Sequence, residues 1–128
     1  MTDARNSIVG TLAGERHAIG AVLVGAAAAV EGWNVLQLGA DLPAAAIAEA
    51  ARSADARVVA VSIVYVEDRD ALLEELRTLR ANLPSAVTVV AGGGGAAGIA
   101  GELSAIGVRV ETSVNGLLGE LRRAEAGV

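Results

Sequence analysis

The only histidine of the chain, His17, lies two residues after Glu15 and three residues before Gly20. A histidine nitrogen can coordinate a transition metal, and a nearby carboxylate can fix the tautomer of that imidazole. Because the sequence has no cysteine and no second histidine, it lacks the nitrogen and sulfur ligands of a closed zinc site. One ligand is enough for a metal that a macrocycle already holds. The stretch 14–20 therefore indicates an axial ligand for a metal cofactor.

Two further stretches could line a binding site. Four consecutive glycines occupy positions 92–95, and Ser62–Val64 ends an apolar run. Glycine has no Cβ, so a flat or elongated ligand can approach the backbone closely, although glycines can also simply end a strand and turn the chain. On the binding interpretation, Gly93→Val should fill the slot and leave the stability of the ligand-free domain nearly unchanged.

The rest of the sequence alternates between apolar runs typical of strands and segments typical of helices. Pro43 suits the start of a helix, and Asp68 suits the cap of another. Five strands and five helices in alternation predict an α/β fold, a flavodoxin-like (Rossmann-like), doubly wound parallel sheet with strand order 2-1-3-4-5. The expected strands are 7–11, 33–38, 57–64, 87–91 and 107–110, and the expected helices are 21–30, 44–52, 69–82, 96–105 and one that opens at Ser113 or Asn115 and ends near 124–127. In such a sheet ligands bind at the carboxyl ends of the strands, so the three stretches should converge there.

Composition limits the class of protein. The 128 residues are 53% hydrophobic, which suffices for one core, and we expect a single domain over 1–128. The net charge is -5, and all ten basic residues are scattered arginines, so direct binding of nucleic acid is not expected. The longest apolar run, 19–30, is too short to span a bilayer, and the start has no apolar signal segment. We therefore expect a cytoplasmic protein without a membrane segment.

Together, Glu-x-His-x-x-Gly at 15–20, Ser-x-Val at 62–64 and Gly-Gly at 92–93 resemble the cobalamin-binding domain family. That family carries Asp-x-His-x-x-Gly, Ser-x-Leu or a close variant, and Gly-Gly on a flavodoxin-like fold. The resemblance implies that His17 ligates the cobalt of cobalamin from the lower face and that Glu15 replaces the family's Asp as the partner of the imidazole. The cofactor-binding residues that it implies are Glu15, Arg16, His17, Ile19, Gly20, Ser62, Val64, Gly92, Gly93 and Gly94.

The Glu-x-His form and the stretch 32–43 look closest to the light-sensing, cobalamin-dependent MerR-type regulators. This resemblance implies a sensor or regulatory module, not a complete enzyme, with a protein partner covering the upper face of the corrin. The alternatives are the small cobalamin subunit of a mutase or corrinoid methyltransferase, and a degenerate interaction module without cofactor. Adenosylcobalamin, methylcobalamin and hydroxocobalamin all remain open as the bound form.

Other nucleotide and phosphate sites fit less well. Positions 93–98 satisfy Gly-x-Gly-x-x-Gly, but they follow the fourth expected strand, whereas a dinucleotide fingerprint follows the first strand of a βαβ unit. The chain has no lysine, which excludes the usual P-loop. A phosphoacceptor receiver would need an aspartate where Ser62 stands.

Overall fold

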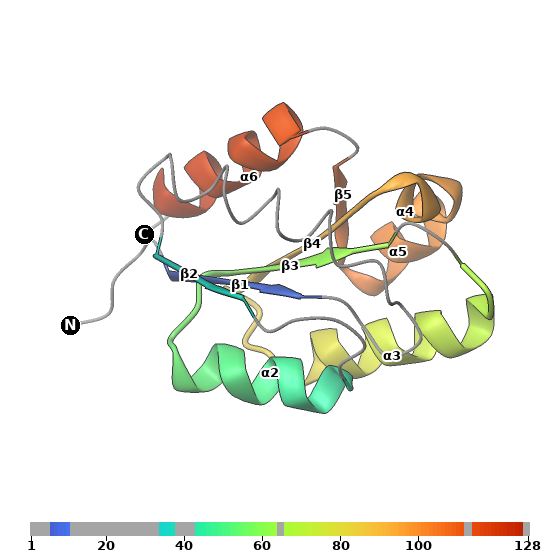
Figure 1. The fold of residues 1–128 in the computed structure, drawn as a ribbon, viewed down its shortest axis with the longest axis horizontal. Helices are drawn as coiled ribbons and strands as arrows, with labels where there is room; N and C mark the ends of the chain where they lie inside the picture. The colour runs from blue at the N-terminus through green and yellow to red at the C-terminus, as the bar shows by residue number, and fades with distance from the viewer. Residues whose placement is uncertain (1–5, 11–33, 38–42, 64–65, 112–113, 127–128) are drawn as a thin grey trace.

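The computed structural model describes residues 6–10, 34–37, 43–63, 66–111 and 114–126. In this part of the chain, parallel strands form one sheet in the order β2-β1-β3-β4-β5, with α2 and α3 along one face and α6 on the other (Figure 1). The predicted parallel α/β sheet is confirmed. The strands are β1 Asn6–Gly10, β2 Asn34–Gln37, β3 Val58–Ser62, β4 Thr88–Gly92 and β5 Arg109–Glu111, and the helices are α2 Ala44–Ser53, α3 Arg69–Ala81, α4 Gly94–Gly98, α5 Ala100–Ile106 and α6 Val114–Ala126.

Strand β3 lies in the middle of the sheet, between β1 and β4. All five of its residues are buried, as expected for a parallel strand with helices on both faces. Beneath it, α2 turns Ala44, Ile47, Ala48 and Ala51 inward. Three alanines on this face let the helix backbone lie close to the sheet, so the core is filled by small and branched side chains.

Two helix starts agree with the sequence. Helix α3 begins after Asp68, whose carboxylate accepts the Ala71 amide at 3.0 Å, and α2 begins after Pro43. Asn115 as the opening residue of the last helix is wrong, because α6 begins at Val114. The expected helix 21–30 lies outside the described residues.

The expected single helix 96–105 is also wrong. The chain forms two short helices, α4 and α5, that meet at Ile99, where φ is -125°. Gly92 ends β4, and Gly94 and Gly95 already belong to the first turn of α4, so only Gly93 of the four-glycine stretch is a connection. The expected strand at 107–110 starts later, because Gly107 adopts a left-handed φ of 96° that ends α5.

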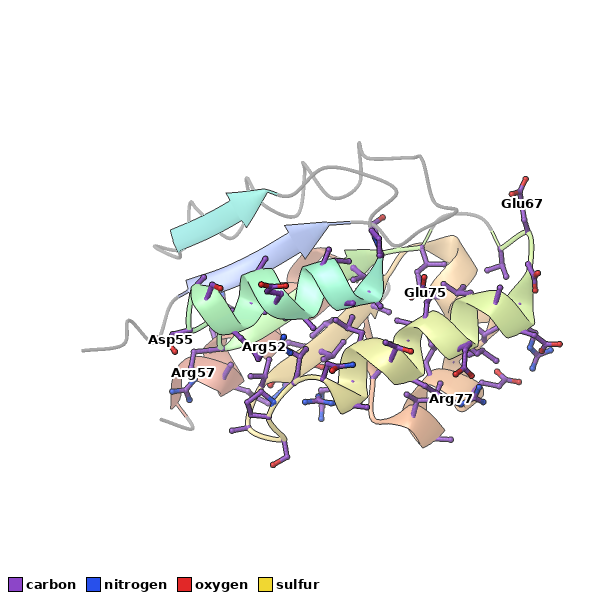
Figure 2. All side chains as sticks on the ribbon, turned by 90° about the horizontal axis from the view of Figure 1, so that it is seen from below. Arg52, Asp55, Arg57, Glu67, Glu75 and Arg77 are labelled. Atoms are coloured by element: carbon purple, nitrogen blue, oxygen red, sulfur yellow. The ribbon has the colours of Figure 1, made fainter. Side chains whose placement is uncertain are left out.

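Glu75 joins the two helices that cover this face. Pro43 precedes α2 and has no side chain that could accept a hydrogen bond, which leaves the first amides of α2 without a local cap. The Glu75 carboxylate of α3 accepts the Ala44 amide at 3.3 Å (Figure 2). A negative charge here also complements the positive end of the α2 dipole. Glu75 thus acts as an N-cap supplied from the neighbouring helix.

We expect Glu75→Ala to lower the free energy of unfolding by about 1 kcal/mol, because it removes an N-terminal cap. Glu75→Gln should cost less, since the amide oxygen can still accept the bond. The matched control is Glu74→Ala, which removes an exposed carboxylate whose ionic partner among the described residues is Arg77 on its own helix. This change should alter stability by less than about 0.5 kcal/mol. Urea unfolding followed by circular dichroism measures all three. Equal losses for positions 74 and 75 would contradict the role of Glu75.

Candidate functional site

Four strand ends define one edge of the sheet. Ser62, the last residue of β3, pairs with Gly92, the last residue of β4, and Gly92 pairs with Glu111, the last residue of β5. On the other side, Gly10 at the end of β1 pairs with Val61. The structure therefore brings Ser62 and Gly92–Gly94 together at the carboxyl edge, beside the place where the chain leaves β1.

The Ser62 side chain is a buried polar group at this edge. The residue is only 8% exposed, and no hydrogen bond to its hydroxyl is seen from any described residue. Buried hydroxyls are nearly always paired, so a group with no partner in the described part of the protein is suited to a ligand. Its neighbours across the strand pair, Gly92 and Gly93, offer only backbone.

Gly93 has a structural role that the sequence does not reveal. Its φ is 104°, and a Cβ at this position would lie 2.4 Å from the Ile63 carbonyl oxygen. The Ile63 amide donates to Gly92 O at 2.7 Å, and the Ile63 carbonyl accepts from the amides of Gly95 at 2.9 Å and Ala96 at 3.3 Å. The turn after β4 thus closes around the backbone of Ile63. The expectation that Gly93→Val leaves stability nearly unchanged is wrong, because this contact leaves no space for a side chain.

Gly94 differs from its neighbour. It is exposed, its φ is not in the positive region, and a Cβ built there would meet nothing within 4 Å. Gly92 is intermediate, since its Cβ would lie 3.1 Å from Glu111 O. Of the three glycines, Gly94 is therefore the one whose missing side chain leaves open space outside the fold.

A charged cluster that the sequence analysis did not predict lies next to this edge. Glu120 of α6 is 2% exposed and accepts Arg109 Nε at 2.6 Å and an Arg123 terminal nitrogen at 2.7 Å. Glu111 lies 3.7 Å from Arg123. The only signals in the sequence are the i, i+2 spacing of Arg109 and Glu111 and the i, i+3 spacing of Glu120 and Arg123, which also fit ordinary surface positions. The cluster ties α6 to β5.

The pKa values of the two carboxyls of the cluster, Glu111 and Glu120, are shifted in opposite directions. Burial alone would raise the pKa of Glu120, but hydrogen bonds from Arg109 and Arg123 outweigh it and hold the pKa below its usual value. The pKa of Glu111 is raised, first by its hydrogen bond to Glu120 and then by burial. Of the two carboxyls, Glu111 therefore takes up a proton at the higher pH.

The remaining predicted site residues, Glu15, Arg16, His17, Ile19, Gly20 and Val64, lie outside the described residues. Within the described ranges, no group of three or more His, Cys, Asp or Glu side chains could hold a metal ion. The same part of the chain contains no helix both long and apolar enough to cross a membrane. The predicted cobalt ligand therefore remains a prediction from the sequence.

Residues 5–114 match the family model described as "B12 binding domain". The chain belongs to the B12-binding domain family. Its cofactor is accordingly cobalamin, and the described edge fits such a group: it offers one buried hydroxyl, at Ser62, and open space beside Gly94. The family match argues against a module that has lost its cofactor. A comparison with curated proteins finds no match.

Solved structures share the fold of this B12-binding domain at low sequence identity. A novel cobalamin-binding protein from Desulfitobacterium hafniense DCB-2 has a TM-score of 0.79 and 20% identity over 93% of this chain and 58% of its own. The monomethylamine corrinoid protein of Methanosarcina barkeri has a TM-score of 0.78 and 18% identity, over 94% of this chain and 58% of its own. A chain of the methanol:cobalamin methyltransferase complex of the same organism has a TM-score of 0.80 and 16% identity, over 98% of this chain and 48% of its own. The chain thus spans about half the length of these chains.

We expect substitution by valine to have different effects at Gly93 and at Gly94. Gly93→Val should lower the free energy of unfolding by about 3 kcal/mol, because it combines a strained φ with a clash against backbone. Gly94→Val should change stability by less than about 0.5 kcal/mol, since glycine and valine differ little in helix propensity and the space is open. Thermal unfolding of the cofactor-free domain compares them. Equal stability of the two variants would contradict the tight contact at Ile63.

Proposed function

We propose that this chain is a cobalamin-binding sensor or regulatory module in which His17 is the lower axial ligand and a protein partner covers the opposite face of the corrin. The observation that carries the proposal is the convergence of Ser62 and Gly92–Gly94 at one edge, next to the end of β1. His17 follows Gly10, the last residue of β1, by seven positions. Seven residues can extend at most about 25 Å, so the histidine is within reach of this edge.

Each residue has a separate task in this proposal. The His17 imidazole must be neutral to offer a lone pair, and the Glu15 carboxylate accepts a hydrogen bond from the other ring N–H, which fixes the orientation of the ring. The Ser62 hydroxyl provides a hydrogen bond to the nucleotide tail, and Gly94 leaves room for it. Cobalamin itself supplies, in its adenosyl form, a photolabile cobalt–carbon bond. Cover from a partner is expected because the sheet and helices form only the lower side of such a site.

A second candidate function is favoured by two of the structural neighbours. One is a corrinoid protein for monomethylamine and another is part of a methanol:cobalamin methyltransferase complex. On this alternative, the chain is the cobalamin-carrying component of a methyltransferase or a mutase, and the partner is the catalytic subunit. The Glu-x-His form at positions 15–17 supports the sensor, so the sensor remains the leading proposal.

His17→Ala should abolish the absorption spectrum of histidine-ligated cobalamin and weaken binding. Glu15→Gln keeps the ligand and removes only its charged partner, so it should weaken cobalamin binding about tenfold to a hundredfold without changing the ligation state.

For the unsubstituted chain, the affinity for cobalamin should fall as the pH drops below about 6.5, where a free histidine becomes protonated. Titration with hydroxocobalamin, read by visible absorption and by gel filtration, tests all three. If the spectrum and affinity of His17→Ala match those of the parent, the axial assignment is wrong.

Light separates the two candidate functions. With adenosylcobalamin bound, the sensor predicts that green light changes the elution volume of the chain alone or its affinity for a partner, because the ligand shifts the population of states only through differential affinity. If the chain is instead a cobalamin carrier, light should change neither the elution volume nor the affinity for a partner, and the bound corrinoid should accept a methyl group when a methyltransferase is added. Size-exclusion chromatography in the dark and after illumination measures the first result. A stable dimer that forms without cofactor and buries residues 14–20 would contradict cover by a partner.

A further inference from the structure

The edge of the sheet opposite the cobalamin site carries a hollow of about 380 Å³. It lies between the end of α2, the start of β3 and the connection from α3 to β4. Arg52, Asp55 and Arg57 appear together at one end of the molecule, whereas Glu67 lies at the other (Figure 2). The apolar lining consists of Ala51, Ala56, Leu83, Pro84, Ala86 and Val87, and the charged lining of Arg52, Asp55 and Arg57.

Hydrogen bonds fix the walls of the hollow in position. Arg52 donates to Asn82 O at 2.6 Å and so links the ends of α2 and α3. Arg80 donates to Val87 O at 2.8 Å and to Pro84 O at 2.6 Å, which fixes the connection before β4. Pre-formed, largely apolar hollows with a few polar groups are the usual form of small-molecule sites.

The wall at the end of α2 is fixed by a Schellman motif. The Ala56 amide donates to Ala51 O at 2.9 Å, and the Asp55 amide donates to Arg52 O at 3.2 Å. Asp55 occupies the left-handed position, with a φ of 52°, where glycine or asparagine is usual. A carboxylate at the negative end of a helix dipole is also unfavourable. The aspartate therefore has no stabilising role in the backbone here, but its charge faces the hollow.

The charge of the hollow differs from that of the chain. The chain carries -5, whereas the hollow has two guanidinium groups and one carboxylate. Within the described part of the chain, Arg57 makes one long hydrogen bond, to Ala124 O at 3.4 Å, and Arg52 makes one to Asn82 O. Each guanidinium has five N–H donors, so several on each remain for a ligand. A net charge of one positive unit matches a single carboxylate better than a doubly charged phosphate.

We propose that this hollow binds a small organic monocarboxylate with an apolar body, whose carboxylate is held by Arg57 and Arg52. The apolar body lies against the alanine, leucine, proline and valine side chains of the floor. Asp55 lowers the affinity for anions and sets the preference for a single negative charge. The site does not use the cobalamin edge, so the inference stands independently of the proposed cobalamin function.

The probe is hexanoate, compared with its neutral methyl ester and with inorganic phosphate, each titrated into the ¹⁵N-labelled full chain. We expect hexanoate to shift the amide signals of Ala51, Ala56 and Val87 with a dissociation constant on the order of 1 mM, as a ligand of this size allows. Methyl hexanoate and phosphate should bind at least about tenfold more weakly, because one lacks the charge and the other lacks the apolar body.

Substitutions make the site assignment falsifiable. Arg57→Gln should weaken hexanoate binding about tenfold. Arg77→Gln should leave it unchanged, because Arg77 is exposed on α3, outside the hollow, and pairs with Glu74. Asp55→Asn tolerates the left-handed backbone and should tighten binding about threefold or more, since it removes a like charge. No shift of these signals with hexanoate, equal binding of the ester, or equal effects of positions 57 and 77 would overturn the proposal. Binding of an acidic peptide but not of hexanoate would overturn it in favour of a protein-docking surface.

Discussion

The close contact between Ile63 and the turn after β4 is the constraint on which the carboxyl edge depends. The backbone of Ile63 bonds to Gly92, Gly95 and Ala96, and Gly93 passes so near that only glycine fits. This contact fixes where Ser62 ends its strand relative to the glycines, and it starts α4 without a connecting loop. A binding edge made of backbone is rigid, because its position depends on hydrogen bonds and not on side-chain rotamers.

The outer parts of the domain are held in place by charged side chains that act at helix ends and strand edges. Glu75 caps α2 from α3. Two ion pairs join α6 to β5, one between Glu120 and Arg109 and one between Arg123 and Glu111. Edge strand β5 is three residues long, and its partner helix contributes few buried side chains among those described, so the charges supply specificity of position there. Among the described residues, the apolar core packs the central strands against α2 and α3 and extends to α4 and α5.

Local sequence patterns correctly predicted those elements whose formation depends on a few neighbouring residues. The unbroken apolar run of β3, the Asp68 cap and Pro43 before α2 each express a preference of a few neighbouring residues, and each agrees with the structure. The tight contact of Gly93 with Ile63 and the pairing of Glu120 with Arg109 depend on residues farther away in the sequence, which no local pattern reveals. The glycine stretch indicated a binding edge, but its sequence did not distinguish a glycine needed by the fold, Gly93, from one that leaves space, Gly94.

The two edges of the sheet differ in the kind of ligand they suit, and the chemistry of their residues explains the difference. At the carboxyl edge, Ser62 and Gly92–Gly94 carry no charge, and a hydrogen bond to Glu120 followed by burial raises the pKa of Glu111 beside them. Such an edge can hold a large cofactor through hydrogen bonds and shape. At the opposite edge, Arg52 and Arg57 face a hollow that is only partly neutralised by Asp55. Charge recognition needs long side chains with free donors, and at this edge, where the strands begin, Arg52 and Arg57 supply them.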